Sequence, residues 1–296
     1  MHARELMLHT LRLAAPPPTS LSVIAREKCE GYQRLLVSFA GDEGEAIPGF
    51  LFQPEGAGPF SAVIVWHQHN SQWHLGKSEV AGLWGDPFQA FGPALAKRGV
   101  VVLAPDVLSF EDRRPHARGT EAHERDWLNH FNTMGAHLVR GDLFLRKVLD
   151  DARRATSALL AWPGVAKVGA LGHSMGGLIS LHHGVVDERL GFLGLSGSVA
   201  RFSRRIAEGV PINMLELIPG LAARLETEDL LRALAPRPLL VVSSDEDRFS
   251  HDAEAVLAEA RPAWRDPRAV TSLRVSGGHG LTAERFSAIV DWCVGM

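Results

Sequence analysis

The chain is short of cysteine, of net charge and of long apolar runs. Its two cysteines, Cys29 and Cys293, lie far apart and fit no metal or redox spacing, so we expect both thiols to be reduced. The formal net charge of −3 indicates no surface for nucleic acid or an anionic membrane. No apolar run is long enough to span a bilayer, and polar residues interrupt residues 1–15, where a signal peptide would lie. We therefore expect a cytoplasmic protein with no membrane or nucleic-acid partner.

Metal-binding patterns are also missing. The chain has 14 histidines, but most are single, and the close groups are His67 with His69 and His182 with His183. Neither group has a third ligand at a spacing typical of a metal site. We therefore expect no metal and no cofactor. The sequence does not indicate an oligomeric state.

The chain does have enough apolar sequence for a sizeable core. It is 46% hydrophobic over 296 residues, which suits one large domain. The runs expected as buried strands are 61–66, 100–104, 168–171, 190–195, 239–242 and 272–275. The segments expected as helices between and after them are 86–98, 145–160, 251–260 and 286–293. This alternation predicts an α/β fold with a mostly parallel, doubly wound central sheet.

The first sixty residues depart from this alternation. Residues 33–39 and 47–53 read as two strands around a polar turn, and predict an antiparallel hairpin at the sheet edge. Residues 1–30 are interpreted as an N-terminal helical arm, whose second helix covers about 21–30. Residues 31–296 are then expected to form one main α/β domain.

Two long excursions interrupt the main domain. Residues 107–141 are polar and follow a predicted strand, so they form either a lid that borders the active site or a solvated surface segment. Residues 199–235 form a second excursion with helical pieces. We expect both to shape the substrate pocket.

The strongest local signal is a strand, a sharp turn and a helix around Ser174. An apolar run ends at Gly172, residues 172–176 read Gly-His-Ser-Met-Gly, and a helical segment follows. This is the context of a nucleophile elbow, which lifts the serine hydroxyl above the sheet. Gly172 and Gly176 are expected there because a Cβ atom would clash with the neighbouring backbone.

An acid and a histidine follow Ser174 in chain order, each just after a predicted strand. Asp247 or Asp245 follows the strand at 239–242, and His279 follows the strand at 272–275. An imidazole can take the serine proton, and a carboxylate fixes its tautomer and stabilises the imidazolium. The glycines of residues 277–280 are expected to let the histidine loop approach the serine closely.

Backbone amides are expected to complete the site. The N–H of Met175, at the start of the helix after the elbow, can point at a developing oxyanion. The second donor should come from the loop after the strand at 61–66. The N–H of Gln68 is the first choice there, with its neighbour His67 as the alternative.

Aromatic side chains near these loops have two interpretations. His67 and His69 either take part in proton transfer or, as we favour, pack and hydrogen-bond within their loop. Trp73 and Trp84 either line the acyl or alcohol pocket or belong to the core.

Four segments together resemble α/β-hydrolases of the dienelactone hydrolase-like group, close to its acetyl-xylan-esterase and carboxylesterase relatives. They are residues 67–70 with 76–79, 172–177, 235–240 and 277–280. The dienelactone hydrolases proper use a cysteine nucleophile, whereas this chain has Ser174, which favours ester hydrolysis. In the family the acid stands three residues after a glycine at the position of Ser244, which implies Asp247 as the acid.

These observations predict a serine carboxylic-ester hydrolase that acts on a small-molecule ester through an acyl-enzyme. Its expected catalytic residues are Ser174, Asp247 and His279, with Gln68 and Met175 as oxyanion donors and no metal. The alternatives are a lactone or dienelactone-type hydrolase or a peptidase on the same triad, and a binding protein that has kept the fold.

Overall fold

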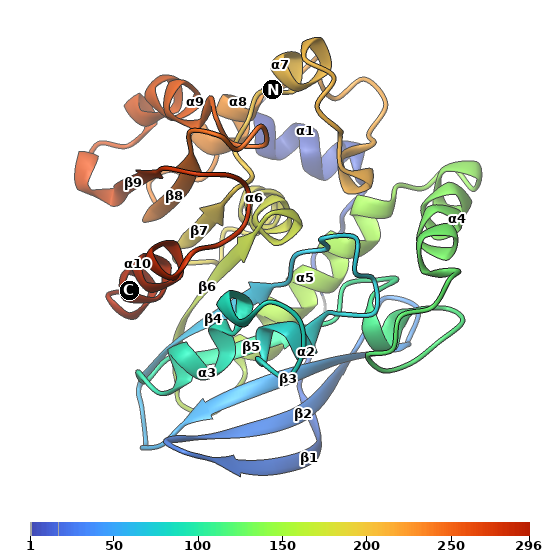
Figure 1. Ribbon diagram of the computed structural model, residues 1–296, viewed down its shortest axis with the longest axis vertical. Helices are drawn as coiled ribbons and strands as arrows, with labels where there is room; N and C mark the ends of the chain where they lie inside the picture. The colour runs from blue at the N-terminus through green and yellow to red at the C-terminus, as the bar shows by residue number, and fades with distance from the viewer. Residues whose placement is uncertain (1, 17) are drawn as a thin grey trace.

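The strands that carry the predicted site form one sheet of nine strands in a computed structural model that describes residues 2–16 and 18–296. Met1 and Pro17, which belong to the expected arm, lie outside the described residues. The sheet order is β1-β2-β3-β5-β4-β6-β7-β8-β9 (Figure 1). The strands are β1 (Ser22–Cys29), β2 (Tyr32–Ala40), β3 (Ala46–Pro54), β4 (Phe60–Trp66), β5 (Val101–Pro105), β6 (Val165–His173), β7 (Leu193–Ser196), β8 (Leu239–Ser244) and β9 (Val270–Val275).

Strand direction divides the sheet into two parts. From β5 through β4 and on to β9, every neighbouring pair is parallel. β2 and β3 form the expected antiparallel hairpin, and β3 joins the parallel part by pairing antiparallel with β5. The hairpin is not at the sheet edge as expected, because β1 pairs with β2 on its outer side. The predicted fold class, a mostly parallel sheet with an N-terminal antiparallel hairpin, is therefore confirmed.

One expected helix is wrong. Residues 22–29 form the edge strand β1, which pairs antiparallel with β2, rather than a helix over 21–30. Most side chains of β1 are exposed, because the strand has a neighbour on one side only and little packs against either face. The period-2 alternation that identifies a half-buried strand is consequently weak there. The division of the chain into an arm and one domain stays a prediction.

The helices cover both faces of the sheet (Figure 1). They are α1 (Ala3–Thr10), α2 (Lys77–Val80), α3 (Phe91–Ala96), α4 (Asp126–Val139), α5 (Phe144–Leu160), α6 (Met175–Val186), α7 (Phe202–Ala207), α8 (Thr227–Arg232), α9 (Ala253–Ala260) and α10 (Ala283–Val294). Short 3₁₀ turns are η1 (Pro87–Gln89), η2 (Glu111–Arg113), η3 (Met214–Glu216), η4 (Arg261–Ala263) and η5 (Pro267–Ala269). None of the helices in the described ranges is both long and apolar enough to cross a membrane.

Successive side chains of a buried strand pack into two separate hydrophobic cores, one on each face of the sheet. In β4, Ile64 and Trp66 pack with α1, α5 and α6, whereas Val63 and Val65 pack with α3 and α10. This alternation follows from the pleat, which points successive side chains to opposite faces. Strands buried on both faces read as continuous apolar runs, which is why the sequence identified them.

The excursions both emerge from the carboxyl edge of the parallel strands. Residues 107–141 follow β5 and contain η2 and α4, and residues 199–235 follow β7 and contain α7, η3 and α8. In Figure 1, α4 stands away from the sheet on the same side of the molecule as the loop after α7. Open α/β sheets bind ligands at this edge.

Candidate active site

The turn around Ser174 has the geometry of the predicted elbow. Ser174 lies between β6 and α6 with φ 56° and ψ −122°, a backbone conformation that is rare for any residue other than glycine. A Cβ atom on Gly172 would lie 2.2 Å from the backbone of Gly176, and one on Gly176 would lie 1.9 Å from the carbonyl oxygen of Trp66. Both glycines are therefore required by the close approach of the backbone, as expected.

A continuous line of hydrogen bonds connects Ser174 to Asp247. The Ser174 Oγ lies 2.7 Å from Nε2 of His279, and Nδ1 of the same ring lies 3.0 Å from Oδ1 of Asp247. The three residues come from the ends of β6, β8 and β9, so the parallel sheet brings them to one edge. This is the spatial arrangement of a nucleophile, a base and an acid that orients the base.

Asp247 is buried, and both oxygens of its carboxylate accept hydrogen bonds. Oδ1 also accepts the N–H of Phe249 at 3.0 Å, and Oδ2 accepts the Ser250 hydroxyl at 2.6 Å. Burial alone would raise the pKa of Asp247, but the bond from His279 and these two bonds outweigh it and lower the pKa. The carboxylate therefore stays ionised near neutral pH, as a partner of an imidazolium must.

Asp245, the alternative acid, has a different task. It is exposed, and its carboxylate accepts the N–H of Gly277 at 2.9 Å and the hydroxyl of Ser276 at 3.1 Å. It therefore ties the histidine loop to the loop after β8.

The glycines of the histidine loop are not needed for a close approach to the serine, so that expectation is wrong. A Cβ on Gly277, Gly278 or Gly280 would meet nothing within 4 Å. Gly277 is needed instead for its φ of +106°.

Sequence reasoning missed the groups that anchor the histidine loop. Arg285, on α10, donates to the carbonyl oxygens of Gly280 at 2.8 Å and Gly278 at 2.9 Å, and the Ser244 hydroxyl also donates to Gly278. These bonds fix the backbone on both sides of His279. No local pattern marks them, because α10 and β8 meet the loop only after the sheet has formed.

Two rings pack against the imidazole of His279. The rings of Phe249 and His173 have centroids 4.9 Å and 5.0 Å from it. His173 is buried, and burial lowers its pKa to about 3, so it stays neutral beside His279. A neutral neighbour lets His279 accept a proton without opposing a second positive charge.

Ser174 opens into a cavity of about 470 Å³, a size typical of small-molecule sites. Trp127 and His130 of α4 line it, so residues 107–141 border the site as one of the two interpretations expected. Trp73 lines it too, whereas Trp84 is exposed and does not. The remaining lining residues are His69, Asn70, Ser71, Met175, Leu178, Gly197, Ser198, Arg205, Pro211, Ile212, Asn213, Met214, Arg248, Phe249 and His279.

Solved structures share this architecture. A structure described as a candidate acetyl xylan esterase from Bacteroides fragilis NCTC 9343 superposes with a TM-score of 0.75, over 92% of this chain and 73% of that chain, at 17% identity. A glucuronoyl esterase from Solibacter usitatus superposes with a TM-score of 0.65, over 98% of this chain and 91% of that chain, at 15% identity. The chain has the α/β-hydrolase fold.

Sequence comparison finds a distantly similar protein. The Bacillus subtilis (strain 168) protein YtaP, named as a candidate hydrolase, is 25% identical over 247 residues, which cover 79% of this chain and 76% of that protein. No protein-family model matches the chain. The α/β-hydrolase fold is thus carried here by a divergent sequence.

The two expected oxyanion donors differ in their position relative to the cavity. Met175 is the first residue of α6, where a helical N–H has no partner within the helix, and it lines the cavity. Gln68 does not line the cavity, although His69, Asn70 and Ser71 of the same loop do. Its side chain turns away and donates to Oε1 of Glu79 at 3.0 Å. The role of the Gln68 N–H stays a prediction.

His67 holds this loop in place, as the favoured interpretation expects. Its Nε2 lies 3.1 Å from the backbone N of Val107, and its Nδ1 lies 2.8 Å from the carbonyl oxygen of Gln68. Because an N–H can only donate, Nε2 accepts and Nδ1 carries the proton. Burial lowers the pKa of His67 to about 4, so the ring remains neutral and bridges the loops after β4 and β5.

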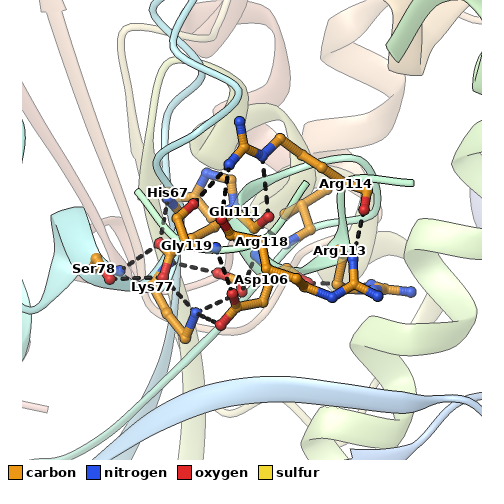
Figure 2. A network of polar contacts seen from close by, with 12 residues as sticks. His67, Lys77, Ser78, Asp106, Glu111, Arg113, Arg114, Arg118 and Gly119 are labelled. Carbon is orange, nitrogen blue, oxygen red and sulfur yellow. Dashed lines mark hydrogen bonds and ion pairs between the residues drawn. The ribbon is translucent and has the colours of Figure 1, made fainter. Parts of the chain in front are cut away.

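A largely buried charge cluster joins the same two loops. Figure 2 shows Lys77 beside Asp106 and Glu111. The Lys77 ammonium bonds the carboxylates of Asp106 at 2.9 Å, of Asp112 at 2.6 Å and of Glu111. Glu111 also accepts the N–H groups of Gly76 and Ser78, both at 2.9 Å. The cluster pins the start of α2 to η2 and so fixes the loop that carries His69 and Asn70.

Three carboxylates of this cluster lie close enough to share a cation. The side chains of Asp106, Glu111 and Asp112 have ligand atoms within 4.8 Å of one another, but the Lys77 ammonium already bonds all three. A second group consists of Asp42, Asp150 and Asp151. It is likewise paired with a side-chain cation, because the Lys147 ammonium bonds Asp42 and Asp151. Both groups therefore read as ion-pair networks.

Proposed function

We propose that this chain is a serine carboxylic-ester hydrolase that works through an acyl-enzyme. The observation that carries the proposal is the unbroken hydrogen-bonded line from Ser174 through His279 to Asp247, opening into a cavity of about 470 Å³. A serine hydroxyl is a weak nucleophile until a base takes its proton, and an oriented imidazole supplies that base.

In the first half-reaction, Ser174 Oγ attacks the ester carbonyl carbon while its proton passes to Nε2 of His279. The carbonyl π electrons move to the oxygen, and the N–H of Met175, with that of Gln68, stabilises the resulting oxyanion. The tetrahedral intermediate then expels the alcohol. His279 returns the proton from Nε2 to the leaving oxygen, and the acyl group remains on Ser174.

In the second half-reaction, water attacks the acyl carbon and gives a proton to Nε2 of His279. The second tetrahedral intermediate collapses, the bond to Oγ breaks, and His279 returns the proton to Ser174. The acid product leaves. Asp247 remains ionised throughout, fixes the tautomer with the proton on Nδ1 and stabilises the imidazolium.

Several observations support ester substrates over the alternatives. The solved structures with this fold that are named above are described as esterases. The nucleophile is a serine, unlike the cysteine of the dienelactone hydrolases proper. Lactone or dienelactone-type ring opening and peptide hydrolysis on this chain's own triad are the alternatives, and a substrate panel separates them. A binding protein that had lost catalysis has no need of the intact hydrogen-bonded line.

The test is a panel of p-nitrophenyl esters, lactones and short peptides, each assayed with the wild-type chain and with Ser174→Ala. We expect turnover of the esters by the wild type and none by the variant. Turnover of lactones alone, or of peptides alone, would replace the proposal with the corresponding alternative. Turnover that survives in the variant would remove Ser174 from the mechanism.

A further inference from the structure

A second hollow lies next to the catalytic cavity. Its volume is about 370 Å³, and it is formed mainly by residues 202–223 together with Leu138 of α4. Its other lining residues are Phe202, Ile206, Ile212, Glu216, Leu217, Ile218, Pro219, Gly220, Leu221, Ala222 and Ala223. We call this hollow the apolar groove, because all of these side chains except that of Glu216 are uncharged and nearly all are hydrocarbon.

Glu216 lines the apolar groove, but its charge is paired. Its side chain is buried, and Oε2 accepts a hydrogen bond from Nη1 of Arg205 at 2.8 Å. Arg205 is also buried, yet it lines the catalytic cavity on the other side. This ion pair therefore lies in the wall between the two hollows, and its charges are already neutralised by one another.

Two features connect the apolar groove to the catalytic cavity. Ile212 lines both hollows, so they lie on either side of one half-buried side chain. α4 runs along both, with Trp127 at the cavity and Leu138 at the groove. Eleven residues separate these two, which is about 16 Å along a helix. The two hollows thus lie side by side, with Ile212 at their common border.

The apolar groove exposes hydrocarbon that nothing within the described residues covers. Ile206 is 61% exposed, Leu217 is 41% exposed and Leu138 is 38% exposed. Large apolar side chains that gather in a hollow mark a binding site for an apolar ligand. Because Ile212 borders both the groove and the Ser174 cavity, a substrate bound at Ser174 is the ligand nearest to the groove.

We propose that the apolar groove binds an aliphatic chain of the substrate ester, longer than acetyl, which passes Ile212 on its way from the reacting carbonyl. This inference rests on the proposed function and names its substrate class. Each methylene that enters the groove leaves water, which favours longer chains by up to about fourfold in kcat/KM per methylene.

The test compares chain-length preference in two variants that carry the same substitution, isoleucine to aspartate, at different positions. Ile206→Asp puts a carboxylate into the apolar groove, and Ile24→Asp is the matched control, because Ile24 is 60% exposed on the distant edge strand β1. The readout is the ratio of kcat/KM for a long chain to that for acetate. We expect Ile206→Asp to lower this ratio about tenfold or more, since a carboxylate beside hydrocarbon is costly, and Ile24→Asp to leave it unchanged.

Two substrate series locate the chain within the ester. One runs from p-nitrophenyl acetate to the octanoate, and the other runs from ethyl acetate to octyl acetate. A lowered ratio in the first series assigns the groove to the acyl part, and in the second series to the alcohol part. Ile212→Trp, which narrows the passage, should lower the ratio in the same series. Circular dichroism verifies that each variant is folded.

Other results would overturn the inference separately from the proposed function. Hydrolysis of acetate esters with a ratio that neither Ile206→Asp nor Ile212→Trp changes would remove the chain-binding role and leave the esterase intact. If Ile206→Asp instead converted a dimer to a monomer in sedimentation, with an unchanged ratio, the occupant would be a second copy of this chain. Failure of the wild type to hydrolyse any ester would overturn the function and this inference together.

Discussion

Nδ1 of His279 lies 3.0 Å from Asp247, whereas Asp245, two residues earlier in the same loop, holds the backbone N–H of Gly277. Both aspartates thus serve the histidine loop, one at the imidazole and one at the backbone. The difference arises because Asp247 is buried under Phe249 and Ser250, while Asp245 stays at the exposed start of the loop.

Replacement of the buried aspartate should impair catalysis without unfolding the chain. Asp247→Asn can donate to the imidazole and so favours the wrong tautomer, which lowers kcat by about 10³ to 10⁴ by analogy with serine proteases. Asp245→Asn should cost far less, because the side-chain oxygen still accepts the Gly277 N–H. The measurement is steady-state kinetics of both variants at matched circular dichroism. A greater loss in Asp245→Asn would show that the acid is misassigned by two residues.

Removal of one hydroxyl should abolish turnover. Ser174→Ala removes the Oγ atom alone from a half-buried side chain, so the fold remains and kcat falls by about 10⁵ to 10⁶. Ser38→Ala, in β2 and away from the site, serves as the matched control and should keep full activity. Ester hydrolysis assays of both variants provide the comparison, and near-normal turnover by Ser174→Ala would contradict the mechanism.

A methyl group should destabilise the chain at Gly176 but have little effect at Gly278. Gly176→Ala places Cβ 1.9 Å from the Trp66 carbonyl oxygen, so α6 must shift and the free energy of unfolding should fall by about 3 kcal/mol or more. Gly278→Ala meets nothing within 4 Å and should change it by less than about 0.5 kcal/mol. Urea unfolding measures both. Equal losses in the two variants would mean that the elbow can relax around the added atom.

Stability should depend on pH through Glu79. This carboxyl is buried beneath the loop of Gln68, and burial raises its pKa to about 7. The folded chain therefore holds a proton that the unfolded chain releases near pH 4.5, so Glu79 favours folding at low pH and this contribution is lost as the pH rises to about 7. Glu79→Gln keeps the neutral form and should gain about 3 kcal/mol relative to the wild type between pH 4.5 and 8.

Unfolding in urea at pH 5 and pH 8 measures this difference. Glu55→Gln, at an exposed turn, is the control and should show no such change between the two pH values. A constant difference between Glu79→Gln and the wild type at both pH values would mean that Glu79 is ionised in the folded chain.

Local sequence was enough to predict the parts of the fold that local geometry determines. The turn at Ser174 requires Gly172 and Gly176 within four residues, and buried parallel strands are continuous apolar runs. Chain order then placed Asp247 and His279 after the correct strands, and the structure brings both to Ser174. Their catalytic roles stay predictions, as does the cytoplasmic location.

The rest depends on contacts between distant segments. β1 is a strand because it pairs with β2, although its exposed residues carry no alternation. Arg285 reaches the histidine loop from α10, and the cavity is lined by Trp127 and Ile212 from two different excursions. Such positions have no signature within a window of ten residues, so periodicity and motif spacing could not reveal them.

The most direct test of the central claim is labelling with a fluorophosphonate, which reacts covalently with an activated serine, followed by mass spectrometry of the digested protein. We predict one adduct, on the peptide that contains Ser174, and its absence in Ser174→Ala and after denaturation. Because His279 activates the hydroxyl, His279→Ala should also suppress the label. An adduct on another residue, or a folded wild-type chain that takes up no label, would contradict the account.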